Sequence, residues 1–137
     1  MKNVAIGLGL VVVLAGCAET RLNMARENWQ SRSPRSYQFE YSDSFVPGGI
    51  YLVKVQEGFV TAATEKKTGQ PPPADVLSRL PTIEKLLAVI GRGIREASSV
   101  SASYDSAGFP TKVDIAWKEN MDELEQIVSV SSFRTLP

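Results

Sequence analysis

Residues 81–94 read PTIEKLLAVIGRGI, and this stretch predicts the clearest helix of the chain. Thr82 follows a proline and is suited to cap the N-terminus of the helix with its hydroxyl oxygen. Apolar residues then recur at the spacing of one helix face, at Ile83, Leu86, Leu87, Ile90 and Ile94. We expect that face to cover a sheet. Gly91 and Gly93 each weaken a helix by roughly 1 kcal/mol relative to alanine. Either the helix ends early there, or it approaches a strand closely.

Segments on both sides of this helix have the alternation of apolar and polar residues that is typical of half-buried strands. Three precede the helix and three follow it, at residues 37–42, 50–56, 59–64, 100–104, 113–117 and about 126–133. Glu57 and Gly58 form a tight turn that makes a hairpin of the second and third strands. Strands that follow one another so closely are expected to pair antiparallel. A further helix before the first strand completes the order α-β-β-β-α-β-β-β. The pattern predicts an α+β fold, with an antiparallel sheet of about five to six strands and one main helix packed across one face.

The connections between these elements are polar. Residues 65–73 are rich in lysine, glycine and proline, and Pro71, Pro72 and Pro73 favour an extended conformation, so we expect an exposed linker. A ligand for a proline-recognising partner is the less common use of such a run. Residues 118–123 are expected to form a polar loop before the last strand.

The first helix is expected over residues 19–31, where Leu22, Ala25 and Trp29 share one face. Two interpretations remain open from the sequence. Either this helix packs on the domain, which would then sit close to any membrane anchor, or residues 18–26 fray and act as a short tether.

The N-terminus has the pattern of a secretory signal peptide. Lys2 supplies the positive charge, residues 4–14 the apolar core, and Ala15 and Gly16 the small residues before a cleavage site. The apolar run is shorter than the roughly 20 residues that span a bilayer.

Residues Leu14, Ala15, Gly16 and Cys17 resemble the lipobox of bacterial lipoproteins. The resemblance implies transfer of diacylglycerol to the Cys17 sulfur and cleavage before that residue. The alternative is a plain secretory signal that leaves an unpaired thiol in an oxidising compartment. Ala18 follows the cysteine, and similarity to enteric sorting signals then favours the outer membrane. We therefore predict a lipid-anchored protein that faces the periplasm.

Three regions follow from this interpretation. Residues 1–16 form the signal peptide, residues 17–27 the lipidated N-terminus with a short tether or the start of the first helix, and residues 28–137 a single α+β domain. Cleavage before Cys17 leaves 121 of the 137 residues, which is enough for one compact domain.

Composition excludes several function classes. The chain has 15 basic and 15 acidic residues, so its net charge does not favour nucleic acid. It has no histidine, and its one cysteine is expected to carry lipid. Catalytic triads with histidine, zinc sites of imidazole or thiolate, and structural disulfides are therefore not expected. We predict no metal, no cofactor and no catalytic residue.

The domain also resembles DUF6174, a family of small bacterial envelope proteins of unknown function, from about residue 28 to residue 136. The residues that carry the resemblance include Trp29, Tyr37, Phe39, Tyr41, Val53, Val55, Gly58, Val60, Pro81, Thr82, Ile83, Leu86, Val100, Ile115, Val128, Val130, Phe133 and Arg134. The most specific portion is the turn with Tyr104, Asp105, Gly108, Phe109 and Pro110. Many members have paired cysteines after the first strand. Because this chain has Ser42, Asp43 and Ser44 there, no disulfide or redox role carries over, and the loop is expected to be looser.

Three groups of residues are candidates for a functional site. Asp105 and Asp114 flank one hairpin and could form a carboxylate pair for general acid and base catalysis. A structural role explains them better, because Asp105 fits a turn residue and Asp114 a solvent-facing strand residue. Lys66 and Lys67 are an ordinary solvated loop rather than a headgroup site. The aromatic residues belong mainly to the core, namely Tyr37, Phe39, Tyr41, Tyr51, Phe59, Trp117 and Phe133. Trp29 and Trp117 are the best candidates for partial exposure beside a ligand groove.

These observations predict a noncatalytic, membrane-anchored envelope protein that binds a protein partner, with sheet edges open to strand addition. The alternative is a binder of a small apolar or lipid-like ligand between helix and sheet. An exposed apolar patch over a solid core would favour the first, and an enclosed cavity the second.

Overall fold

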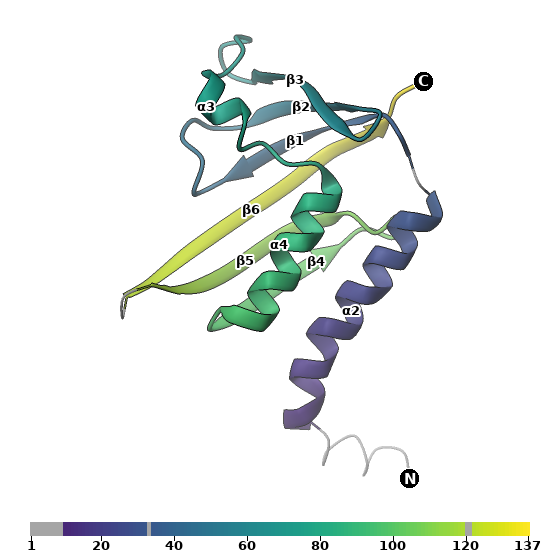
Figure 1. The fold of residues 1–137 in the computed structure, drawn as a ribbon, viewed down its shortest axis with the longest axis vertical. Coiled ribbons are helices and arrows are strands. Elements are labelled where there is room, and N and C mark those ends of the chain that lie inside the picture. Colours follow the sequence, from purple (N-terminus) through teal and green to yellow (C-terminus); the bar gives the residue numbers. More distant parts are fainter. Residues whose placement is uncertain (1–9, 33, 120–121) are drawn as a thin grey trace.

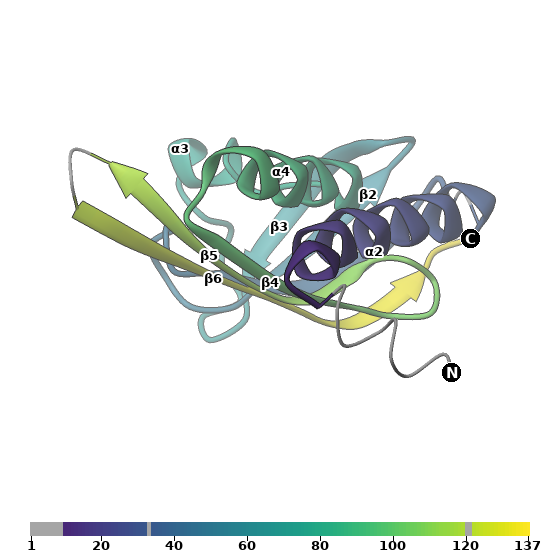
Figure 2. The same cartoon turned by 90° about the horizontal axis from the view of Figure 1, so that it is seen from below.

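The computed structural model describes residues 10–32, 34–119 and 122–137, which form one antiparallel sheet with helices on one of its faces (Figures 1 and 2). The elements are α2 (Leu10–Arg32), β1 (Tyr37–Asp43), β2 (Tyr51–Gln56), β3 (Phe59–Glu65), α3 (Ala74–Leu77), α4 (Ile83–Glu96), β4 (Ser99–Tyr104), β5 (Pro110–Glu119) and β6 (Asp122–Thr135). The α+β fold and the order of its main elements are confirmed. The four-residue helix α3 is an addition, too short for its periodicity to be read from the sequence.

The sheet has six strands in the order β3-β2-β1-β6-β5-β4. All five neighbouring pairs are antiparallel. The first and last strands of the chain are therefore neighbours at the centre, where Tyr41 lies opposite Val130 and Asp43 opposite Val128. This pairing joins the two halves of the sequence into one sheet and brings the end of β1 beside β6.

Helix α4 follows the predicted pattern. Thr82 caps it, since its Oγ1 accepts a hydrogen bond from the Lys85 amide at 3.2 Å. Its apolar face is buried against the sheet, and the helix continues to Glu96. The two glycines reflect close packing, because a Cβ atom on Gly93 would lie 2.9 Å from Val100 Cγ2.

Helix α2 packs on the domain, which decides between the two interpretations of its first residues. Leu22, Ala25 and Trp29 are at most 3% exposed and face the core. The helix begins at Leu10, well before the predicted start at residue 19, and passes through Cys17 without interruption. Within the described ranges, neither α2 nor another helix combines the length and apolarity needed to cross a membrane.

The predicted polar loop at 118–123 is wrong. Lys118 pairs with Glu123, and Glu119 with Asp122, so that only residues 120–121 separate β5 from β6. Backbone groups make the ladder between two strands, and exposed strand ends therefore accept polar side chains. The resulting hairpin extends past the end of α4 (Figure 1).

The core is aromatic at one end of the sheet. Tyr37, Phe39, Tyr41 and Tyr51 are at most 4% exposed, as expected. Phe59 does not belong to it, because that side chain at the start of edge strand β3 is 72% exposed.

Candidate functional site

An open groove of about 360 Å³ lies between α4 and the projecting β5–β6 hairpin. We call it the hairpin groove, and it is lined by Phe45, Val89, Arg92, Glu96, Trp117, Lys118, Leu124 and Gln126. It forms because the two strands continue beyond the helix that covers the rest of the sheet. Phe45 and Leu124 are 42% and 43% exposed, so two large apolar side chains of the groove face solvent together.

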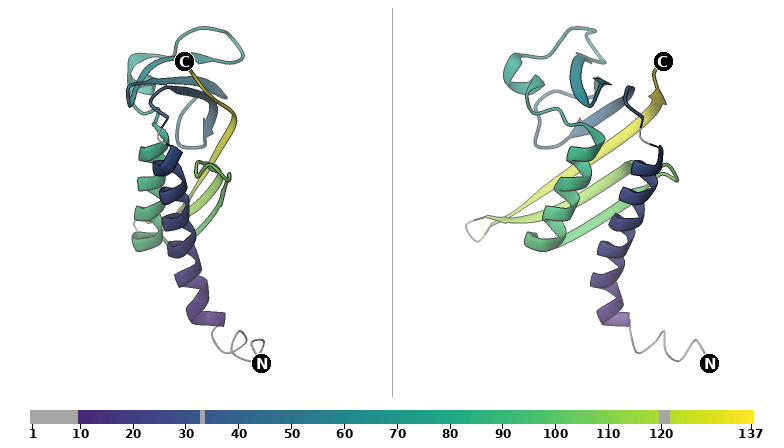
Figure 3. Two further views of the ribbon diagram at one scale, coloured as in Figure 1. Left: turned by 90° about the vertical axis from the view of Figure 1, so that its right-hand side faces the viewer. Right: turned by 45° about the vertical axis from the view of Figure 1, so that its right-hand side comes forward.

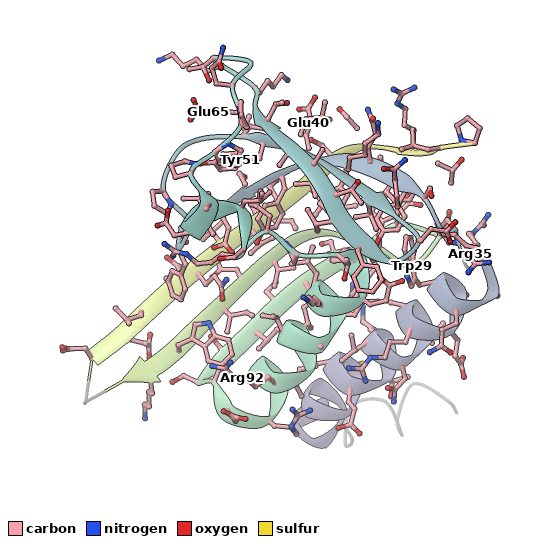
Figure 4. All side chains as sticks on the ribbon, turned by 45° about the horizontal axis from the view of Figure 1, so that its top comes forward. Trp29, Arg35, Glu40, Tyr51, Glu65 and Arg92 are labelled. Carbon is pink, nitrogen blue, oxygen red and sulfur yellow. The ribbon has the colours of Figure 1, made fainter. Side chains whose placement is uncertain are left out.

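Trp117 is one of the lining residues and is held from two sides. The Arg92 guanidinium carbon lies 4.6 Å from the centroid of its ring, within the range of a cation–π contact. Arg92 extends from α4 toward the hairpin (Figure 4). On the strand side, Trp117 Nε1 donates to Gln126 Oε1 at 2.9 Å. The ring is therefore held by contacts from both elements.

Asp43 links Trp117, through Gln126, to Phe45. Its Oδ2 accepts hydrogen bonds from Gln126 Nε2 at 3.0 Å and from the Tyr41 hydroxyl at 2.6 Å. Its Oδ1 accepts from the Phe45 amide at 2.8 Å. Burial, and then the nearby Asp43 carboxylate, raise the pKa of Tyr41 far above its usual value, so that this hydroxyl stays a donor. One carboxylate thus orders both aromatic sides of the groove.

Residues 42–44 are well ordered by hydrogen bonds, contrary to the expectation of a looser loop. The Ser44 amide donates to the Ile127 carbonyl at 3.0 Å, and Ser44 Oγ accepts from the Ile127 amide at 2.9 Å. These bonds extend the β1–β6 pairing into the loop that carries Phe45.

Replacement of Asp43 by asparagine is expected to destabilise the domain by about 1–3 kcal/mol, because an amide cannot accept all three of these hydrogen bonds. Urea unfolding followed by tryptophan fluorescence measures the loss. Asp75→Asn, in the first turn of exposed helix α3, is the matched control and should change stability little. Equal unfolding midpoints for the two variants would contradict the role of Asp43.

Asp105 and Asp114, the candidate catalytic pair, each contact a different group. Asp105 Oδ2 accepts from the Ala107 amide at 2.9 Å, as a turn residue does. Asp114 lies next to Glu125 across the β5–β6 ladder, and this contact raises the pKa of Glu125. The structure therefore favours the turn and strand explanations over an acid and base pair.

Of the two tryptophans expected at a groove, Trp117 is half-buried as predicted and Trp29 is not. Trp29 is 3% exposed, and its Nε1 donates to Glu84 Oε2 at 2.7 Å. The Tyr37 hydroxyl donates to Glu84 Oε1 at 3.2 Å. Sequence reasoning missed Glu84, which joins α2, β1 and the start of α4. A carboxylate in the first turn of a helix gives no signal of such partners.

The other candidates lie outside the hairpin groove. Lys66 pairs with Glu40 at 2.9 Å in the exposed turn after β3. Cys17 is exposed on α2, at the rim of a separate groove of about 200 Å³. In the part of the chain that the structure describes, no group of three acidic, cysteine or histidine residues is placed to hold a metal ion.

Comparison with known proteins identifies the family. Residues 21–135 match the family of unknown function DUF6174. The chain belongs to the DUF6174 family. No curated protein and no solved structure matches the chain.

The DUF6174 match starts at residue 21, so it includes the part of α2 that packs on the sheet. It also includes every residue of the hairpin groove. The turn at residues 105–110 packs on α2, because a Cβ atom on Gly108 would lie 2.5 Å from the Trp29 amide nitrogen, and Phe109 stacks on Phe133 of β6 at a centroid distance of 4.4 Å.

Proposed function

We propose that this DUF6174 protein is a noncatalytic, lipid-anchored interaction domain of the bacterial cell envelope that binds a protein partner in the hairpin groove. The observation that carries the proposal is an ordered aromatic groove with exposed Phe45 and Leu124 walls beside a filled core. Partner-binding sites centre on such fixed aromatic and arginine side chains. The lipobox-like residues before Cys17 support the anchor, and Ala18 supports the outer membrane, facing the periplasm.

The charges around the groove suit a partner segment with apolar and acidic side chains. Arg92, Lys118 and Glu96 line it, so basic side chains outnumber acidic ones there, and Arg92 pairs with Glu96 at 3.6 Å in an exposed ion pair. Exposed pairs of this kind contribute little and exchange readily.

The alternative, an apolar ligand held between helix and sheet, has less support. Ile90 of α4 and Val113 and Ile115 of β5 are at most 1% exposed, so little of their apolar surface is left for a ligand where α4 covers β5. The groove is open to solvent, which suits a protein segment better than an enclosed small molecule.

Photo-crosslinking in intact cells tests the proposal, with the photoreactive residue at Leu124 in one strain and at Ile127 in another. Both positions are on β6 and are similarly exposed, at 43% and 41%. Leu124 lines the groove, whereas Ile127 pairs with Asp114 on the opposite face of the sheet. We expect one reproducible envelope protein to be captured from position 124 and not from 127.

A second measurement uses the captured protein. Leu124→Asp should weaken its binding about tenfold or more, as truncation of a central contact does, and Ile127→Asp should not. No capture at position 124, or the same products from both positions, contradicts the proposal. The alternative would be favoured by a lipid that copurifies with the domain and is lost when a bulkier side chain fills the hairpin groove.

A further inference from the structure

One end of the domain brings Cys17 together with the C-terminal part of α4 and with β4. There a groove of about 200 Å³ lies between the three elements, and we call it the anchor-side groove. The residues that matter for its chemistry are Cys17, Arg21, Ile94, Val100, Ala102 and Tyr104. Strand β3, helix α3 and the C-terminus lie at the opposite end (Figures 1 and 3).

The helix leaves no room for a flexible tether at this end. Cys17 and Leu22 are five residues apart in one continuous helix, which is about 7.5 Å along its axis. Leu22 is already 2% exposed in the core. Acyl chains attached to Cys17 would therefore start within about one nanometre of the packed domain.

The chemistry of the anchor-side groove fits the boundary between phospholipid headgroups and acyl chains. Ile94, Val100, Ala102 and Tyr104 are all only partly buried, so apolar surface remains open. Arg21 lies at its rim, where its Nη2 donates to the Ala102 carbonyl at 3.2 Å and its guanidinium carbon is 6.0 Å from the Tyr104 ring centroid. An apolar surface with a basic side chain at its edge is suited to the membrane interface, where Arg21 would meet the headgroups.

We propose that the anchor-side groove is a second membrane contact, on which the acylated domain rests directly against the phospholipid surface with β3 and α3 pointing away. The inference rests on the lipid anchor of the proposed function and adds a fixed orientation to it. Helix α2 then acts as a rigid mount. The hairpin groove, which is lined by Glu96 at the C-terminal end of α4, would lie close to the bilayer.

The test is a comparison of fluorescent labels at the two ends of the acylated protein. Single cysteines are introduced by Ser98→Cys, in the turn after α4, and by Lys67→Cys, in the turn after β3. Both positions are exposed. Each labelled protein is purified from membranes and incorporated into vesicles of phosphatidylethanolamine and phosphatidylglycerol that contain a headgroup quencher. We expect strong quenching at position 98 and little at position 67.

The matched control inserts a long flexible glycine-serine segment between Ala18 and Glu19, which should reduce the quenching at position 98 several-fold. Equal quenching at positions 98 and 67 in a protein that mass spectrometry shows to be acylated overturns the orientation alone. Unchanged quenching after the insertion overturns the role of α2 as a mount. A product without acyl chains that stays off the vesicles overturns the anchor as well.

Discussion

Gly108→Ala is expected to destabilise the domain by about 2–5 kcal/mol, a large share of the roughly 5–15 kcal/mol that holds a domain of this size together. Two causes act at this position. The backbone φ angle of Gly108 is +102°, which residues with a side chain rarely adopt. A Cβ atom there would lie 2.5 Å from the Trp29 amide nitrogen and closer still to the Ala25 carbonyl oxygen. Both are backbone atoms of α2, so no side chain can move aside.

Chemical denaturation of the domain measures this loss, and Gly69→Ala is the matched control. Gly69 also has a positive φ angle, +72°, but an added Cβ atom would meet open space. The control should lose only about 1 kcal/mol, the cost of the backbone conformation. If both variants unfold at the same denaturant concentration, contact with α2 is not the reason for glycine at position 108.

The turn at residues 105–110, which carries part of the resemblance to DUF6174, has a structural role. The Asp105 carboxylate and backbone shape the turn, since the Gly108 amide donates to the Asp105 carbonyl at 2.9 Å. Gly108 then allows the turn to touch α2. The turn thus fixes the first helix to the second half of the sheet.

Cys17→Ser is expected to abolish membrane attachment of the protein. A lipoprotein cysteine carries more than one acyl chain, and each buried methylene contributes about 0.8 kcal/mol. Serine offers no sulfur for the modification, so the whole contribution is lost. Fractionation of cells should then find the protein outside the membrane fraction, and mass spectrometry should show the loss of the acyl groups.

Met24→Ser is the control for this experiment, because Met24 is 57% exposed on the same helix and its loss leaves Cys17 intact. This variant should remain in the membrane fraction with its acyl mass. A Cys17→Ser protein that stays in the membrane fraction with the same mass as the parent would contradict the lipid assignment.

Much of the fold could be predicted from short stretches of the sequence. The Thr82 cap, the apolar face of α4 and the alternation of β1 each depend on residues a few positions apart. The turn at Glu57 and Gly58 is equally local, and both residues have the positive φ angles that such a turn requires. These features reflect the helix and strand periods, which a sequence displays directly.

The hairpin groove could be predicted only in part. Trp117 was expected to be half-buried, and it is. Its partners Arg92 and Gln126 come from other elements, and Asp43 bonds with Gln126 across 83 positions of sequence. Polar residues at strand ends are common, so nothing in their order along the chain marks them as partners.

The sequence by itself determined the order of the main helices and strands, the antiparallel pairing of neighbouring strands and the signal-like pattern of the N-terminus, since each depends on neighbouring residues. Only the tertiary structure decided that β1 and β6 pair at the centre, that α2 packs rather than frays, and that the β5–β6 hairpin extends beyond α4 and leaves a groove. The physical reason is that distant segments associate when their combined surfaces and backbone hydrogen bonds outweigh the entropy of closing long loops. That balance belongs to the whole assembled domain, and no local pattern contains it.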